Sequence, residues 1–230
     1  MGLRGSAVRR LVLASGSPRR KQLLSLLGIP FAIQAAHVDE EPHVGEPPQE
    51  MVVRVARDKA LAVARAHPGE LIIAADTTVA LDGLPVGKPL DMADASRMLR
   101  LLRGRPHVVF TGIVIWHPAA QRTGSELGRS DVWMREYTDE ELDEYVASGD
   151  PLDKAGAYAI QHPVFDPVAR VDGCWLNVMG MPLCHLGRAL AAAGVAVPAH
   201  VPGSCRAFTQ RECAVGAAIL DGRPGSDDAW

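Results

Sequence analysis

The sequence predicts an α/β fold. Short apolar runs alternate along the chain with amphipathic stretches, as expected where strands and helices alternate. The 230 residues, 47% of them hydrophobic, suffice for one compact domain or two closely joined lobes. Aromatic residues make up only 5% of the chain, so valine, leucine, isoleucine and alanine must supply most of the core.

The first expected elements are a strand and a helix. Residues 10–14, which are apolar from Leu11 onward, predict a strand. Ser17 and Pro18 open a helix that Gly28 closes. Serine is a favoured N-cap, proline suits the first helical position, and glycine commonly follows a helix end.

The next elements continue the alternation. Residues 31–35 predict a second strand, and a long helix over residues 49–66 ends before Pro68, which cannot continue it. Residues 71–75 are continuously apolar, as is typical of a strand buried on both faces. Residues 79–86 predict a small hairpin, because an Asp-Gly pair stands at its centre.

The second half begins with a helix and two strands. Asp91 can cap a helix that ends near Gly104, and strands are expected at residues 107–116 and about 130–135. Thr138 and Glu141 form a capping box, which predicts a helix that ends by Gly149.

The C-terminal region contains the predicted domain boundary. Residues 151–161 are expected to join a helix to a strand that ends in Gln161. Beyond Pro182 a final helix closes the predicted globular domain, residues 1–194. Proline, glycine, serine and charged residues then become frequent, which predicts a flexible tail over residues 195–230.

Charge and cysteine content exclude several classes of protein. The chain has 24 Lys and Arg against 27 Asp and Glu, whereas nonspecific nucleic-acid binders carry a strongly basic face. The four cysteines include no CxxC pair, and no secretory segment is recognisable, so we expect reduced thiols in a cytoplasmic protein. No stretch approaches the ~20 apolar residues of a membrane helix.

The first candidate for chemistry is the junction between the first strand and helix. Ser15 precedes a helix start, where free N–H groups and the helix dipole favour an anion. Arg19, Arg20 and Lys21 add positive charge there, at a cost of roughly 0.3–1 kcal/mol each that a triphosphate would reverse. A solvated basic face, with Ser17 as a mere cap, fits the same residues. The absence of GxGxxG and GxxxxGK[ST] argues against dinucleotide and P-loop sites.

Two further candidates stand on the long helix and the buried strand. Lys59 falls within the apolar stripe of its helix, so it either snorkels to solvent or reaches into a polar site. Asp76 stands where the apolar strand ends, the place where open α/β sheets put ligand chemistry. A carboxylate there can hold a divalent ion or take a proton from water, or it can simply form a turn.

Three loop residues complete the candidates. Lys88 lies in a Gly-Lys-Pro loop that can return to the same pocket. Glu40, in an acidic run of three residues, offers a metal or water contact; surface charge is the alternative for both. The amide of Gln161 has a donor and an acceptor, as the reading of a base edge requires, but it is equally compatible with an exposed strand end.

The residues of these segments, and the order in which the segments follow one another, resemble the Maf family over residues 10–194. The resemblance is carried by Leu13-Ala14-Ser15-Gly16-Ser17-Pro18-Arg19-Arg20, Val38-Asp39-Glu40-Glu41, Asp58-Lys59-Ala60, Ala75-Asp76-Thr77, Gly87-Lys88-Pro89, Asp153-Lys154-Ala155-Gly156-Ala157-Tyr158 and Asn177-Val178-Met179-Gly180-Met181-Pro182. It implies a mixed twisted sheet with flanking helices and two lobes around a cleft, as in the inosine-triphosphate pyrophosphatases. It further implies cleavage of a nucleoside triphosphate between its α and β phosphates with a divalent cation, Mg or Mn, and suggests a homodimer.

The resemblance also implies roles for the candidates. Asp76 would be catalytic, and the nucleotide would be bound by Ser15, Arg19, Arg20, Glu40, Lys59, Thr77, Lys88 and Gln161. Arg19, Thr77 and Gln161 match the positions that set base specificity, and they resemble the group acting on dTTP and UTP. The group acting on 7-methyl-GTP has Trp, Gln and Glu there, which suit a cationic purine. That activity, and a non-catalytic regulator of septum formation, are the alternatives.

Overall fold

A computed structural model of the protein describes residues 10–118 and 120–222. A mixed sheet of seven strands stands at its centre, in the order β2-β1-β3-β5-β6-β7 with β4 paired to β3. The strands are β1 (Leu11–Leu13), β2 (Phe31–Ile33), β3 (Leu71–Leu81), β4 (Leu84–Val86), β5 (Pro106–His117), β6 (Arg122–Met134) and β7 (Val168–Gly173). β1 runs parallel to β2 and β3, and the other pairings are antiparallel. The predicted α/β class and mixed sheet are confirmed.

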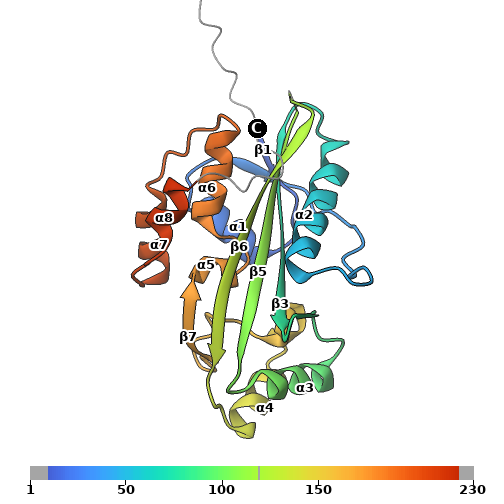
Figure 1. Cartoon of the computed structure of the whole chain (residues 1–230), viewed down its shortest axis with the longest axis vertical. Helices are drawn as coiled ribbons and strands as arrows, with labels where there is room; N and C mark the ends of the chain where they lie inside the picture. The colour runs from blue at the N-terminus through green and yellow to red at the C-terminus, as the bar shows by residue number, and fades with distance from the viewer. Residues whose placement is uncertain (1–9, 119, 223–230) are drawn as a thin grey trace, which may run out of the picture.

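Helices flank this sheet on both faces. They are α1 (Pro18–Ser25), α2 (Pro48–Ala64), α3 (Met92–Leu102), α4 (Asp139–Ala147), α5 (Trp175–Val178), α6 (Leu183–Ala192), α7 (Val201–Thr209) and α8 (Gly216–Asp221), with 3₁₀ turns η1 (Asp150–Asp153) and η2 (Ala155–Ala157). The long strands β3, β5 and β6 join an upper lobe that contains α1, α2 and α6 to a lower lobe that contains α3 and α4 (Figure 1). In the described part of the chain, no helix is both long and apolar enough to cross a membrane.

The two faces of the sheet have separate cores. Alternate side chains of a strand point to opposite faces. In β3, Ile72 and Ala74 pack on α2, whereas Leu71, Ile73 and Ala75 join the larger core with α1 and α6. Continuing this alternation places Asp76 on the face of α2 and Thr77 on the opposite face.

The prediction that a strand ends at Asp76 is wrong. β3 runs on to Leu81, because β5 pairs with it along nearly its whole length and supports the polar stretch. Among the described strands, however, β1 reaches only Ile73 on one edge of β3, and β4 begins to pair at Val79. Between these two partners, residues 74–78 pair with β5 alone. Asp76 therefore lies in mid-strand, at an opening in the sheet.

The predicted strand ending in Gln161 is also absent. The chain passes through η1 and η2 instead, and Gln161 lies in a turn. Gly156 (φ 69°) and Ala157 (φ 60°) have left-handed backbone conformations, which interrupt any extended run. The strand in this region is β7, which pairs with β6 and which the sequence did not suggest.

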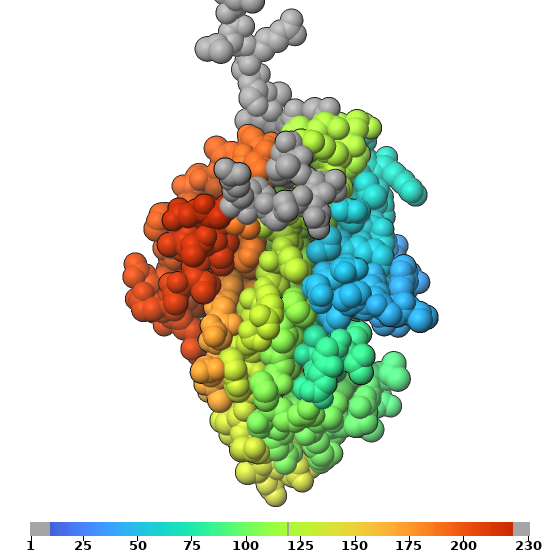
Figure 2. Space-filling model, viewed as in Figure 1, coloured from blue at the N-terminus to red at the C-terminus, as the bar shows by residue number. Residues whose placement is uncertain are grey.

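The prediction of a flexible tail fails for the described residues beyond Gly194. α7 and α8 pack on α6, and Val201 and Cys205 are buried in the main core. Arg188 of α6 bonds to buried Glu126 on β6 and donates to the carbonyl of Ile219 in α8 at 2.7 Å. Figure 2 shows these C-terminal helices in continuous contact with the body of the protein. The segment is polar in overall composition, but it contains a few apolar residues at helical spacing, such as Val201 and Cys205. Residues 223–230 lie outside the described structure.

Candidate functional site

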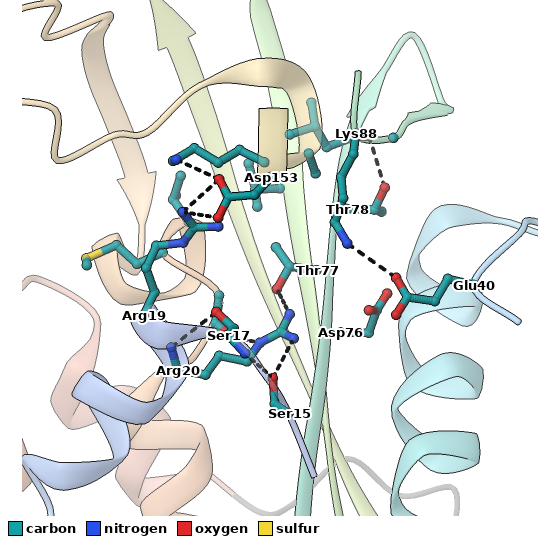
Figure 3. A pocket seen from close by; sticks show the side chains of 18 of the residues that line it. Ser15, Ser17, Arg19, Arg20, Glu40, Asp76, Thr77, Thr78, Lys88 and Asp153 are labelled. Carbon is teal, nitrogen blue, oxygen red and sulfur yellow. Dashed lines mark hydrogen bonds and ion pairs between the residues drawn. The ribbon is translucent and has the colours of Figure 1, made fainter. Parts of the chain in front are cut away.

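A pocket of about 740 Å³ opens where residues 74–78 leave the sheet edge free. α1, α2, β3, the loop after β4, the η1–η2 segment and residues 178–180 line it. Its lining includes all nine residues to which the motif resemblance gives a role, namely Ser15, Arg19, Arg20, Glu40, Lys59, Asp76, Thr77, Lys88 and Gln161. In Figure 3, Glu40 and Asp76 lie on one side of the pocket, and Arg19 lies on the other.

Close packing of α2 on the sheet brings Lys59 to Asp76. Gly112 of β5 is the register partner of Asp76, and α2 crosses directly above it. A Cβ on Gly112 would lie 2.6 Å from the carbonyl oxygen of Val52, so a larger residue would push the helix away. Lys59 Nζ consequently reaches Asp76 Oδ1 at 2.7 Å.

Lys59 joins two carboxylates rather than snorkelling. Its Nζ also lies 2.7 Å from Glu40 Oε1, and its side chain is only 7% exposed. Lys88 Nζ approaches the other oxygen of Glu40 at 3.6 Å from its exposed loop. Burial opposes ionisation of Glu40, but the hydrogen bond from Lys59 and the charges of Lys59, Lys88 and Arg20 outweigh it and lower the pKa of Glu40. The result is a compact cluster of alternating charges.

The three consecutive basic residues at the start of α1, residues 19–21, have different surroundings. Arg20 turns inward and donates to the carbonyl of Gly180 at 3.0 Å, to Thr77 Oγ1 at 3.0 Å and to Ser15 Oγ at 3.4 Å. Burial lowers the pKa of its guanidinium, against the opposing effect of nearby carboxylates. Arg19 turns to another wall of the pocket, and Lys21 is exposed. The run is therefore not a uniform solvated face.

Thr77 presents only a hydrogen-bond acceptor to the pocket. Its Oγ1 lies 3.0 Å from Thr111 Oγ1, and Thr111 donates its single hydroxyl proton to the carbonyl of Asn177 at 2.9 Å. The proton between the two threonines must then come from Thr77. One lone pair of Thr77 accepts from Arg20, which leaves one lone pair for a ligand.

Asp153, Lys154 and Thr111 contribute to the site although their sequence context gave them no function. Arg19 Nη1 lies 3.4 Å from Asp153 Oδ2, and Lys154 Nζ lies 2.7 Å from Asp153 Oδ1. Asp153 and Lys154 stand in one of the motifs quoted above, where a lysine follows aspartates one and four residues earlier. Thr111 carries a hydroxyl within residues 108–116 of β5, which are otherwise apolar. Gln161 lies exposed at the rim of the pocket.

The donor set suits a metal ion that arrives with phosphates. Within residues 10–118 and 120–222, no group of three or more His, Cys, Asp or Glu side chains could hold an ion by itself. Glu40 and Asp76 stand together, held by Lys59. Mg²⁺ is usually bound by one or two carboxylates together with substrate phosphates and water, and Glu40 and Asp76 provide two carboxylates on one side of this pocket.

Known proteins match most of this chain, up to the end of α6. The family model described as "Maf-like protein" covers residues 10–193. A dTTP/UTP pyrophosphatase of Geobacter metallireducens is 46% identical over 185 residues, 80% of this chain and 96% of the relative. One of Myxococcus xanthus is 46% identical over 188 residues, 82% of this chain and 94% of the relative. The Staphylococcus aureus Ham1 structure is 16% identical with a TM-score of 0.45, covering 70% of this chain and 80% of that one.

Proposed function

The chain belongs to the Maf family, and on this basis we propose that it hydrolyses dTTP and UTP to the monophosphate and pyrophosphate. The observation that carries the proposal is the joining of Asp76 and Glu40 through Lys59, beside Arg20, in one pocket. The relatives that match across this chain are named dTTP/UTP pyrophosphatases. A protein that only bound nucleotide would not require this costly arrangement of buried charge.

The proposed division of labour places the phosphates among the cations. Arg20, Lys59 and Lys88 would attract the triphosphate, and Ser15 with the start of α1 would add neutral donors. Asp76 would accept the proton of the attacking water as the bond between the α phosphorus and its bridging oxygen breaks. Lys59 would hold the Asp76 carboxylate in place during that transfer.

Glu40 and Asp76 are the residues that would hold a divalent ion, Mg or Mn, bound together with the nucleotide. Such an ion neutralises developing charge on the phosphate oxygens.

Hydrogen-bond complementarity supports a pyrimidine base. Thymine and uracil have one ring N–H between two carbonyl groups. The acceptor of Thr77 suits that N–H, and the donors of Arg19 and Gln161 suit the carbonyls. Cytosine has no N–H at the corresponding ring position. The Trp and Glu that would favour a methylated purine are absent from these three positions.

The direct test is product analysis with the full chain. Purified protein with Mg²⁺ or Mn²⁺ should convert dTTP and UTP to the monophosphate and pyrophosphate, with dCTP, dATP, dGTP and 7-methyl-GTP cleaved more slowly. Chromatography of the nucleotide product distinguishes this from release of single phosphate groups, which would leave diphosphates. Diphosphate products, or fastest turnover of 7-methyl-GTP, would contradict the proposal.

Base reading at Gln161 can be tested by Gln161→Glu. This change keeps the side-chain volume but replaces an amide donor with a charged acceptor, which would face a carbonyl of the base. Because Gln161 is exposed at the rim, we expect kcat/KM for dTTP and UTP to fall about 5- to 20-fold, with purine nucleotides affected less. Lys88→Ala is the matched control, since losing a phosphate contact should affect all nucleotides alike. An equal loss across the panel in Gln161→Glu would refute the assignment.

A further inference from the structure

Lys154 lines the pocket but has no N–H group left for a phosphate. Its side chain is 8% exposed. Its Nζ contacts the carbonyl oxygen of Asp150, Asp150 Oδ1 at 2.9 Å and Asp153 Oδ1 at 2.7 Å. A lysine ammonium has three N–H donors, and these three oxygens take all of them. Lys154 therefore acts on its neighbours in the chain rather than on a ligand.

Asp153 connects this ammonium to Arg19. The Nη1 atom of Arg19 lies 3.4 Å from Asp153 Oδ2 and 3.5 Å from Oδ1, and Figure 3 shows the two side chains pointing toward each other. Burial opposes ionisation of Asp153, but Lys154 and Arg19 outweigh it and lower the pKa of this carboxyl. Asp153 thus stays ionised at neutral pH and keeps the guanidinium of Arg19 at this wall of the pocket.

Asp150 connects the same ammonium to the turn that carries Gln161. Its Oδ2 accepts from the hydroxyl of Tyr145 at 2.7 Å, and that hydroxyl accepts from the backbone N–H of Ala159 at 2.9 Å. Tyr145 is 3% exposed and stacks on Phe165 with 4.3 Å between ring centroids. Ala159 precedes Gln161 by two residues, so the network also anchors the backbone that leads to Gln161.

We propose that Lys154 is a positioning residue for base recognition, an inference that rests on the proposed function. Through Asp153 it holds Arg19, and through Asp150 it holds the turn of Gln161. Arg19 belongs to α1 and Gln161 follows η2, so two segments far apart in the sequence meet the base in one fixed arrangement. Lys154 and Tyr145 are buried at the centre of this network, where the low local dielectric strengthens their hydrogen bonds, whereas the Asp153 carboxylate is 61% exposed where it meets Arg19.

The test measures binding, which does not depend on turnover. The full chain is titrated calorimetrically with the α,β-imido analogues of UTP and ATP, which resist cleavage at that bond. We expect Lys154→Met to reduce the preference for the UTP analogue by roughly 5- to 20-fold, mainly through weaker binding of that analogue. Lys88→Ala should weaken both analogues equally. An equal loss for both in Lys154→Met would mean that the ammonium serves the phosphates or the fold, and would overturn the inference.

A coupling experiment separates positioning from general stability. In the double variant Arg19→Ala/Gln161→Ala, the further change Lys154→Met should leave the preference unchanged, because the residues it positions are gone. A full additional loss in that background would contradict the inference. If Lys154→Met does not fold, Asp153→Asn replaces it, since asparagine keeps an acceptor for Lys154 but loses the charge that faces Arg19. This variant should reduce the preference by about threefold, and an unchanged preference would overturn the inference.

The wild-type protein distinguishes the two proposals. If it binds the UTP analogue preferentially but releases no pyrophosphate from UTP, the proposed function fails while the positioning role is still measured. If it hydrolyses UTP but binds both analogues equally, the positioning role of Lys154 is refuted and the pyrophosphatase activity stands.

Discussion

Asp76→Asn is expected to reduce kcat by about 10²–10⁴-fold, the usual contribution of a general base. Asparagine has nearly the volume of aspartate but cannot accept the proton of the attacking water. The fold should persist, because Lys59 keeps Glu40 as a partner at 2.7 Å and β3 keeps its pairing with β5. Steady-state kinetics with dTTP, together with thermal unfolding, measures the two effects separately.

Asp82→Asn is the matched control for this variant. Asp82 lies just beyond the end of β3, in the turn between β3 and β4, with its side chain 73% exposed and its carboxylate 2.8 Å from the guanidinium of Arg105. Its φ of 52° suits asparagine, so the substitution causes no strain there. We expect normal kinetics for Asp82→Asn. Near-normal kinetics for Asp76→Asn would show that Asp76 is structural and that the proposed mechanism is wrong.

Lys59→Met should affect stability as well as activity. It leaves Asp76, 9% exposed, and Glu40 facing each other without the intervening cation. Breaking a buried ion pair on one side costs about 3–5 kcal/mol, and the exposure of Glu40 reduces this to about 2–4 kcal/mol in the free energy of unfolding. Urea denaturation at neutral pH measures it. Lys21→Met, at an exposed position in α1, should change this free energy by less than about 0.5 kcal/mol.

The pH dependence identifies the cause of that loss. The pKa of Glu40 is lowered in the folded wild type, so its contribution to stability is present above the ordinary value of 4.5 and is lost as the pH falls below it. The difference between wild type and Lys59→Met should therefore shrink below pH 4.5. Adding Asp76→Asn and Glu40→Gln to Lys59→Met should restore stability but not activity. A difference that is constant with pH would indicate lost packing of the lysine stem instead.

Helix starts and the tight turn were predictable because their energetics are local. Ser17, Asp91 and Thr138 each accept a hydrogen bond from a backbone N–H three residues later, and Thr138 forms the predicted capping box. The hairpin between β3 and β4 turns at Asp82 and the following glycine, both at positive φ, as the Asp-Gly pair indicated. These features depend on side chains and backbone groups that are only a few residues apart, so the sequence itself shows which groups interact.

The membership of the pocket was also predictable, but only from the resemblance of several motifs taken together. Each of Lys59, Asp76 and Gln161 had an ordinary alternative when considered alone. The sequence could not exclude these alternatives, since whether a lysine snorkels or binds depends on what lies opposite it. Here the opposite residue is Asp76, brought near by the close approach of α2 over Gly112.

The α/β class, the helix caps and the Asp-Gly hairpin follow from the sequence, and the motif resemblance adds nine of the residues that line the pocket. The folded chain was needed to show that Asp76 lies in mid-strand, that Arg19 and Arg20 diverge, that Lys154 has no free donor and that residues 201–221 contain two packed helices. The reason is physical. Caps and turns are set by hydrogen bonds between neighbours in the chain, whereas strand length, side-chain burial and ion pairing depend on segments that meet only when the chain has folded.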